Sequence, residues 1–142
     1  MQKLTGGCLC GAVRYEAQTQ STLHYYCHCS DCRRYGGGAY HAAIVVSGEA
    51  LKVTGDLNTW TKVADSSRTV ARHTCPACAN HLFTSPSPDP FRYSIKAGTL
   101  DDPGLFKPRY EIWTASRVEW AAPAENLTGF AAGFEGPLPS WD

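Results

Sequence analysis

The stretch Cys27-His28-Cys29-Ser30-Asp31-Cys32 places three thiols within six positions, in the spacing C-x-C-x-x-C. Three thiolates that lie so close together can hold one metal ion and leave its fourth coordination position open. A closed structural zinc site needs a fourth protein ligand as well. The stretch therefore predicts a metal site, and the remaining cysteines and histidines decide whether that site is open or closed.

The other four cysteines form two pairs, Cys8-x-Cys10 and Cys75-x-x-Cys78. Residues two apart on a strand point to the same face, so Cys8 and Cys10 can present both sulfurs together. The second pair has the spacing of a zinc knuckle. We expect these four thiols to form a closed site, in which metal binding offsets the closure entropy of the 64 residues between the pairs.

This division leaves the triple-cysteine stretch as an open site, but two alternatives stand beside it. The stretch could be closed by one histidine, with His41, His73 and His81 as the candidates. The thiols could also serve redox chemistry, for which Cys75 and Cys78 have a suitable spacing. Seven cysteines is an odd number, so complete disulfide pairing within the chain is impossible.

Composition limits the classes of function. The 142 residues carry zero formal net charge and a pI near 6.9, which argues against a nucleic-acid binder that works by bulk charge. No apolar run approaches the roughly 20 residues of a membrane span, and residues 1–7 lack the apolar core of a secretory signal. We therefore expect a cytoplasmic protein with reduced thiols and no membrane partner.

Short alternating or apolar segments, cut by thirteen glycines and nine prolines, predict a mostly β fold with eight to ten strands and almost no helix. Residues 36–38 (Gly-Gly-Gly) predict a loop, and the prolines of residues 85–90 exclude regular structure there. We expect one domain over residues 1–142, with its core in about 4–120 and an irregular tail in 121–142. The expected strands lie at residues 11–17, 22–27, 39–46, 51–54, 59–64, 68–74, 81–85, 91–97 and 109–116, the last with an extension at 118–120.

Three cysteine-bearing segments carry a resemblance to a known family. Residues 7–15 (G-C-L-C-G-A-V-R-Y), 27–33 (C-H-C-S-D-C-R) and 75–78 (C-P-A-C), with 108–120 after them, resemble the glutathione-dependent formaldehyde-activating enzyme family. That family shares its domain with the centromere protein V group. The resemblance implies an Mss4-like β-tent fold of short antiparallel strands around zinc sites.

The resemblance also implies two zinc ions. It places a structural zinc on Cys8, Cys10, Cys75 and Cys78, and a second zinc at the active site on Cys27, Cys29 and Cys32. The implied activity joins formaldehyde to glutathione, which is a carbon–sulfur lyase reaction read in reverse. The partners would be a small thiol and an aldehyde, and the alternative is a non-catalytic zinc module that binds a protein or nucleic acid.

Several further residues are candidates for that chemistry. His28 lies between two predicted ligands, and strand alternation turns its ring away from the metal, so it is either a supporting residue or a proton-transfer group. Arg33 and Arg34 could bind substrate carboxylates, Tyr35 could contact the substrate or pass a proton, and Trp60 could line the pocket. Exposed charge and core packing are the structural alternatives for these four residues.

One departure from the family pattern concerns the end of the second cysteine pair. Ala79-Asn80 stands where the family usually has glycine. Asparagine tolerates the left-handed conformation better than most residues. We therefore expect Asn80 to preserve the turn with a shifted shape.

Overall fold

The computed structural model describes residues 1–87, 89, 91–123 and 126–137. In chain order its strands and its one α-helix are β1 Gln2–Gly7, β2 Arg14–Thr19, β3 His24–Cys27, α1 Ser30–Gly36, β4 His41–Val46, β5 Leu51–Thr54, β6 Asn58–Val63, β7 Thr69–Thr74, β8 His81–Ser87, β9 Tyr93–Lys96, β10 Tyr110–Ile112 and β11 Thr128–Gly129. Single 3₁₀ turns lie at Gly48–Ala50, Ala97–Thr99, Pro103–Leu105 and Thr114–Ser116. The predicted mostly β fold is confirmed. No helix of the described residues is long and apolar enough to cross a membrane.

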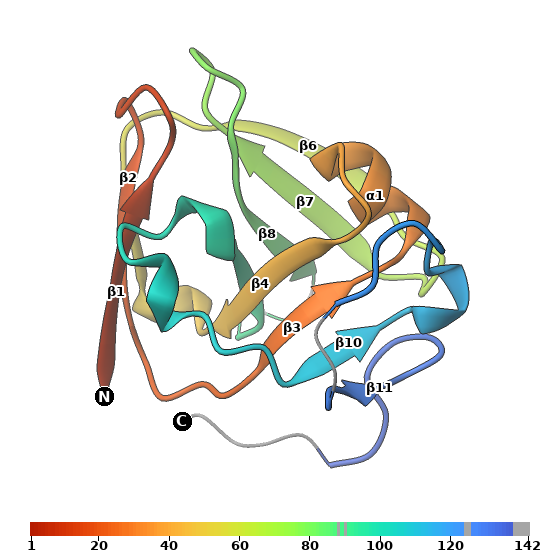
Figure 1. Ribbon diagram of the computed structural model, residues 1–142. Coiled ribbons are helices and arrows are strands. Elements are labelled where there is room, and N and C mark those ends of the chain that lie inside the picture. The colour runs from red at the N-terminus through yellow and green to blue at the C-terminus, as the bar shows by residue number, and fades with distance from the viewer. Residues whose placement is uncertain (88, 90, 124–125, 138–142) are drawn as a thin grey trace.

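Two sheets organise the molecule (Figure 1). The smaller sheet has the strand order β1-β2-β5, and the larger has the order β11-β10-β3-β4-β9-β8-β7-β6. Most neighbouring strands are antiparallel, but β10 runs parallel to both β3 and β11. The helix α1 follows β3 directly, so the triple-cysteine stretch lies at the end of a central strand.

Each cysteine group lies against its own apolar cluster. Cys8 and Cys75 belong to a cluster that joins the two sheets and includes the fully buried Leu4, Ile44 and Leu82. The second cluster lies around β3, β4 and β10 and contains the buried residues Leu23, Tyr25, Cys27, Cys32, Ala43, Val45 and Ile112. The core thus fixes the strand ends from which the cysteines project.

Strand β1 was not predicted, because Gln2–Gly7 has little alternation and ends in two glycines. Pairing with β2 forms it, in a register that sets Gly6 opposite Tyr15. A Cβ atom on Gly6 would lie 2.3 Å from the Tyr15 hydroxyl, so this close approach requires glycine. The strand therefore depends on its partner more than on its own sequence.

The helix α1 corrects the expectation of almost no helix. The Cys29 sulfur caps it by accepting a hydrogen bond from the Cys32 amide at 3.3 Å. Gly37 ends it in the left-handed conformation, with φ of 75°, and its amide donates to the Arg33 carbonyl. Of the predicted glycine loop, Gly36 is the last residue of the helix, whereas Gly37 and Gly38 lie in the loop that follows it. The cap and the glycine together explain a helix of only seven residues.

Strand β8 extends through Pro86 to Ser87, although we expected residues 85–90 to be irregular. On one side β8 pairs with β7 over its whole length, whereas it pairs with β9 only at Phe83 and Thr84. Beyond Thr84 one edge is free, and proline is tolerated at a free edge. Residues 88 and 90 lie outside the described residues.

The segment after β9 also differs from the expectation. The strand predicted at 109–116 ends at Ile112, because Trp113 has a left-handed φ of 57°, and residues 118–120 form no strand. The predicted irregular tail contributes β11, whose flanking amide of Phe130 donates to the Glu111 carbonyl at 2.9 Å. The backbone groups of this part of the tail thus form hydrogen bonds with the edge of β10. Residues 124–125 and 138–142 lie outside the described residues.

Candidate functional site

The sulfurs of Cys8, Cys10, Cys75 and Cys78 all lie within 4.8 Å of one another. The Cys10 sulfur is 3.6 Å from that of Cys8 and 3.7 Å from that of Cys75. Zinc–sulfur bonds of about 2.3 Å give a tetrahedron with an edge of about 3.8 Å. The four thiols therefore fit a closed tetrahedral metal site.

Backbone amides shape this site before any metal binds. The two turns that carry the cysteines, residues 8–13 and 75–80, meet at the same end of the molecule (Figure 1). The Leu9 amide donates to the Asn80 side chain across the two turns, at 2.9 Å. Amides of Asn80 and Cys10 donate to the Cys78 sulfur and lower the pKa of that thiol. Cys78 is thus favoured as a thiolate, the form that a metal binds, whereas hydrogen bonds to Cys8 and Cys75 raise the pKa of Cys10.

The turn of the second pair survives with an unexpected residue in the strained position. Ala79, and not Asn80, takes the left-handed conformation, with φ of 61°. Its amide donates to the Cys75 carbonyl at 2.8 Å. Asn80 instead uses its side chain to link Leu9 to the carbonyl of His81.

The second cluster combines Cys27 and Cys32 of the triple-cysteine stretch with His41 of β4. Cys29, the third predicted ligand, is not a member of this group, and its sulfur caps α1. The ligand atoms of Cys27, Cys32 and His41 lie within 4.8 Å of one another, with 3.8 Å between the Cys32 sulfur and the His41 Nε2. His41 opens β4 and pairs with Cys27 across the sheet. Hydrogen bonds from the thiols of Cys27 and Cys32 lower the pKa of Cys29, whereas hydrogen bonds to Cys29 and Cys32 raise the pKa of Cys27. The three sulfurs thus share protons that a metal ion would displace.

Lys96 determines how the His41 ring is protonated. Its Nζ lies 3.1 Å from the His41 Nδ1, and an ammonium group can only donate. Burial lowers the pKa of Lys96 to about 8, so the ammonium form predominates below that pH. Burial, and then the charge of Lys96, lower the pKa of His41, so the ring is neutral. Its single proton therefore lies on Nε2 and faces Cys32.

This arrangement differs from that of a usual zinc-bound histidine. A zinc-bound imidazole normally donates its second N–H to a carboxylate, a carbonyl or water. Here the second nitrogen of His41 accepts from Lys96. Of the other candidate fourth ligands, His73 hydrogen-bonds to Thr59 and Ser85, and His81 to the Phe83 carbonyl.

His28 points away from the sulfurs. Its ring is fully buried, and its Nε2 donates to the Glu111 carboxylate at 2.9 Å. Arg117 donates to the same oxygen at 2.7 Å, and the ring edge lies against Tyr40. The His28 Nδ1 has no partner within the described residues, and the residue lines neither of the cavities described next. His28 thus ties the cysteine stretch to β10.

Two cavities meet at the second cluster. The first, of about 1410 Å³, is lined by all three cysteines of the stretch together with His41 and Arg72. The second, of about 740 Å³, is lined by Cys32, His41, Arg72 and Lys96. Cys32, His41 and Arg72 line both cavities and separate them. A small molecule in either cavity can therefore reach the cluster.

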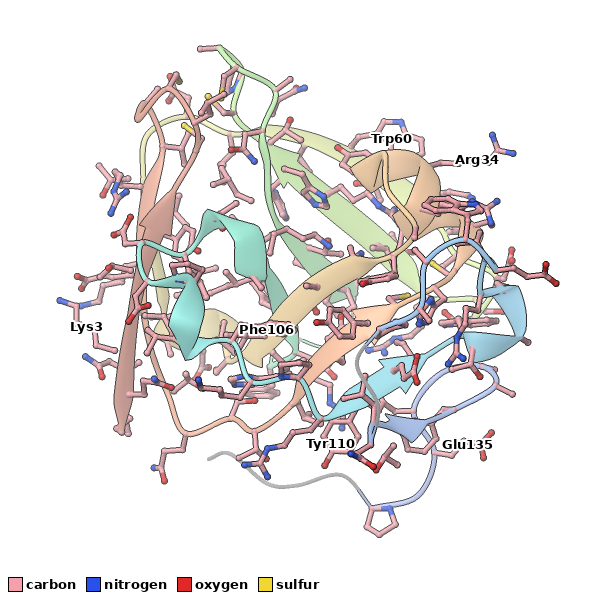
Figure 2. The ribbon with its side chains drawn as sticks, viewed as in Figure 1. Lys3, Arg34, Trp60, Phe106, Tyr110 and Glu135 are labelled. Atoms are coloured by element: carbon pink, nitrogen blue, oxygen red, sulfur yellow. The ribbon has the colours of Figure 1, made fainter. Side chains whose placement is uncertain are left out.

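The predicted substrate-binding residues are placed differently from one another. Tyr35 lines the second cavity, with the Arg72 guanidinium 5.3 Å from its ring centroid. Trp60 stacks on Tyr35 at 6.4 Å but is 53% exposed and lines neither cavity. Arg33 also lines neither cavity, and Arg34 projects outward from α1 (Figure 2).

Four residues of this region were not predicted: Arg72, Lys96, Glu111 and Arg117. Each belongs to a short strand or a turn in which a charged residue usually faces solvent. Lys96 and Arg72 are instead buried at 9% and 6% exposure. No local signal distinguishes them, because only the pairing of β9 with β4 brings Lys96 beside His41.

The structure thus has a mostly β fold, one cluster of four cysteines that could hold a metal ion, and a second such cluster beside two cavities. The chain belongs to the glutathione-dependent formaldehyde-activating enzyme family, whose family model matches residues 3–116. A crystal structure of a Rhodobacter sphaeroides protein is similar in fold, with a TM-score of 0.56 and 22% identity over 68% of this chain and 87% of that chain.

Proposed function

We propose that the protein is a carbon–sulfur lyase that forms and breaks the adduct between a small thiol, such as glutathione, and an aldehyde, such as formaldehyde. The chain belongs to a family of formaldehyde-activating enzymes, and one structural observation supports this activity here. Cys27, Cys29 and Cys32 all line a cavity large enough for both reactants. A cluster with only a structural role would need no such access.

The proposal assigns a zinc ion to each cluster. Cys8, Cys10, Cys75 and Cys78 would hold the structural ion, and the triple-cysteine stretch would hold the second. A zinc ion held there by Cys27, Cys29 and Cys32 would supply a soft Lewis acid that favours the thiolate form of a substrate thiol. His41 stays outside the ligand set, because the hydrogen bond from Lys96 keeps its proton on Nε2. The three cysteines would then be the protein's own ligands, and the cavity that they line would admit the substrate sulfur.

The chain's own residues would then manage the proton. When the sulfur adds to the carbonyl carbon, the S–C bond forms and the carbonyl oxygen gains negative charge and a proton. The His41 Nε2–H lies at the wall between the cavities and can donate its proton to that oxygen, while the Lys96 ammonium passes a proton to Nδ1 so that the ring stays neutral. The proton that the substrate thiol loses would then restore the Lys96 ammonium. Adduct breakdown reverses these transfers.

The remaining predicted residues take supporting roles in this proposal. His28 positions the cysteine stretch through Glu111, since its ring does not reach the cavities. Tyr35 contacts the substrate from the second cavity, and Trp60 supports the Tyr35 ring. Arg33 would contact only a substrate that extends over the outside of α1.

The test follows the exchange between formaldehyde, glutathione and their adduct by NMR, with zinc-loaded protein. The wild type is expected to accelerate exchange above the uncatalysed background. His41→Gln should lower the acceleration about 100-fold, the usual scale of general acid–base catalysis. Zinc content should stay at two per chain in this variant. The control is His73→Gln, because His73 lines neither cavity.

Two results would contradict the proposal. If no aldehyde gives acceleration, the domain is not a lyase, and the non-catalytic zinc module becomes the better description. If His41→Gln loses one zinc, His41 is a ligand and the second site is closed.

A further inference from the structure

Among the described residues, the wall of the second cavity combines two buried cations with no acidic side chain. Lys96 is 9% exposed and Arg72 is 6% exposed, and both line this cavity. All of its described lining residues are cationic, neutral polar or apolar. A buried charge that is not fully balanced by a neighbouring charge is costly, so the partners of Lys96 and Arg72 have to be identified.

The partners of Arg72 within the described residues are few. Its nearest carboxylate oxygen is on Asp31, at 4.0 Å, and that carboxylate is already bound by Lys62 at 2.7 Å. Its guanidinium otherwise lies over the Tyr35 ring. Among the described residues the Arg72 guanidinium forms no hydrogen bond, although it has five N–H donors.

Lys96 is similarly placed. Its ammonium donates to the neutral His41 ring, and no carboxylate within the described residues pairs with it. The neighbouring His81 is neutral as well, since burial lowers its pKa to about 3. The fixed charges of the cavity are therefore those of Lys96 and Arg72, and both are positive.

The cysteine cluster balances only part of this charge. Zinc with three thiolates would carry a single negative charge, which offsets one of the two cations. The other cation, which keeps free N–H donors at the cavity wall, is left for a ligand. Arginine presents a planar fork of donors that matches a carboxylate.

From this arrangement we infer that the second cavity is a carboxylate subsite, in which Arg72 and Lys96 bind a carboxylate of the substrate beside the cysteine cluster. The inference rests on the proposed function, because it assigns the substrate class of the same centre. The carboxylate can belong to the aldehyde or to the thiol. Either placement holds the reacting carbon and sulfur near Cys32 and His41.

The first test measures binding without any reaction. Acetate is titrated into zinc-loaded protein, and the amide NMR signals of Gly98 and Thr99, which line the cavity, are followed. Acetamide is the neutral control of the same shape. Acetate should shift these signals and acetamide should not. Arg72→Gln should weaken acetate binding at least about tenfold, the scale of a charged hydrogen bond.

Two further variants control for effects that are unrelated to the proposed subsite. Arg109→Gln makes the same chemical change at an exposed residue that lines neither cavity, and should bind acetate like the wild type. Arg72→Lys keeps the charge but removes the fork, and should bind acetate several-fold more weakly than the wild type. It replaces Arg72→Gln if the latter does not fold, as judged by zinc content and circular dichroism. Equal shifts by acetate and acetamide, or unchanged acetate binding in a folded Arg72 variant, would overturn the inference.

The second test locates the carboxylate by NMR exchange. Glyoxylate with 2-mercaptoethanol places it on the aldehyde, and formaldehyde with mercaptoacetate places it on the thiol. Formaldehyde with 2-mercaptoethanol has none. At least one carboxylate pair should be accelerated about tenfold more than the neutral pair, and Arg72→Gln should abolish that difference. Equal acceleration of all pairs would refute the subsite and leave the lyase proposal intact. Acetate binding without any acceleration would refute the lyase proposal alone.

Discussion

At the scale of single residues, Ala79 adopts a backbone conformation that is unfavourable for alanine. The turn of the second cysteine pair requires a left-handed residue, and Ala79 fills it with φ of 61°. A residue with a Cβ atom pays about 1–2 kcal/mol in this conformation. Glycine would avoid that strain but would gain freedom in the unfolded chain.

We therefore expect Ala79→Gly to stabilise the zinc-loaded protein by about 0.5–1 kcal/mol, the difference between these opposing effects. Thermal denaturation at equal zinc content measures it. Ala77→Gly is the control, because Ala77 lies in the same turn, is exposed and has no left-handed φ. Its substitution should be neutral or destabilising. An Ala79→Gly variant no more stable than Ala77→Gly would mean that the turn stores no strain.

The sequence alone did not predict that Ala79 would be the strained residue of this turn. The sequence indicated that the usual glycine was missing at Ala79-Asn80, and asparagine was the expected substitute. The structure uses Asn80 as a side-chain link to the Leu9 amide, 71 residues away in the chain. That bond exists only after the two turns have met, so no local propensity reports it.

At the scale of elements, the helix α1 and the second cysteine cluster are built from the same residues. Cys29 caps the helix through its sulfur, Cys32 lies in the first turn, and Cys27 ends the preceding strand. The helix start and the metal ligands are therefore coupled. A substitution at Cys29 can separate the two roles.

Cys29→Ser and Cys29→Ala are both expected to reduce zinc from two to one per chain, because neither side chain replaces a thiolate ligand. Only serine keeps an acceptor for the Cys32 amide, so the alanine variant should be about 1 kcal/mol less stable than the serine variant. Elemental analysis and thermal denaturation measure the two effects. A single zinc in the wild type would refute the division of the cysteines into four and three.

The strands show which elements a pattern can predict. The apolar run over 39–46 predicted β4 closely, because its residues are buried in the centre of a sheet. By contrast, β1 and the end of β8 depend on their neighbours: β2 holds β1 in register, and the free edge beyond Thr84 accommodates Pro86. Such segments become strands because they pair with a neighbouring strand, and the hydrophobic periodicity of the sequence does not reveal that pairing.

At the scale of the whole molecule, the closed cysteine cluster joins two distant turns. It links the turn after β1 to the turn after β7, and it lies against the cluster that packs the two sheets together. Structural zinc contributes on the order of 10 kcal/mol in small domains. That is comparable to the entire stability of a domain of this size.

Removal of metal with a chelator is therefore expected to abolish the cooperative thermal transition and the near-ultraviolet circular dichroism signal. Cys75→Ser should have the same effect even when zinc is supplied, whereas Cys29→Ser should keep both signals. This contrast separates the structural cluster from the proposed catalytic cluster. A metal-free protein with an intact near-ultraviolet signal would show that the sheets hold without the ion.

The spacing of the seven cysteines determined which sulfurs lie together within each local group, because residues on one turn are close whatever the rest of the chain does. The meeting of Cys8 and Cys10 with Cys75 and Cys78, and the approach of His41 to Cys32, required the tertiary structure. Alternation likewise determined the mostly β class, since one face of each strand must be buried. Only the tertiary structure decided the surroundings of the second cluster: the Lys96 donor at His41, the burial of Arg72, and the turning of His28 toward Glu111. These contacts join residues from different strands, and their free energy depends on register and burial, which arise only when the sheets assemble.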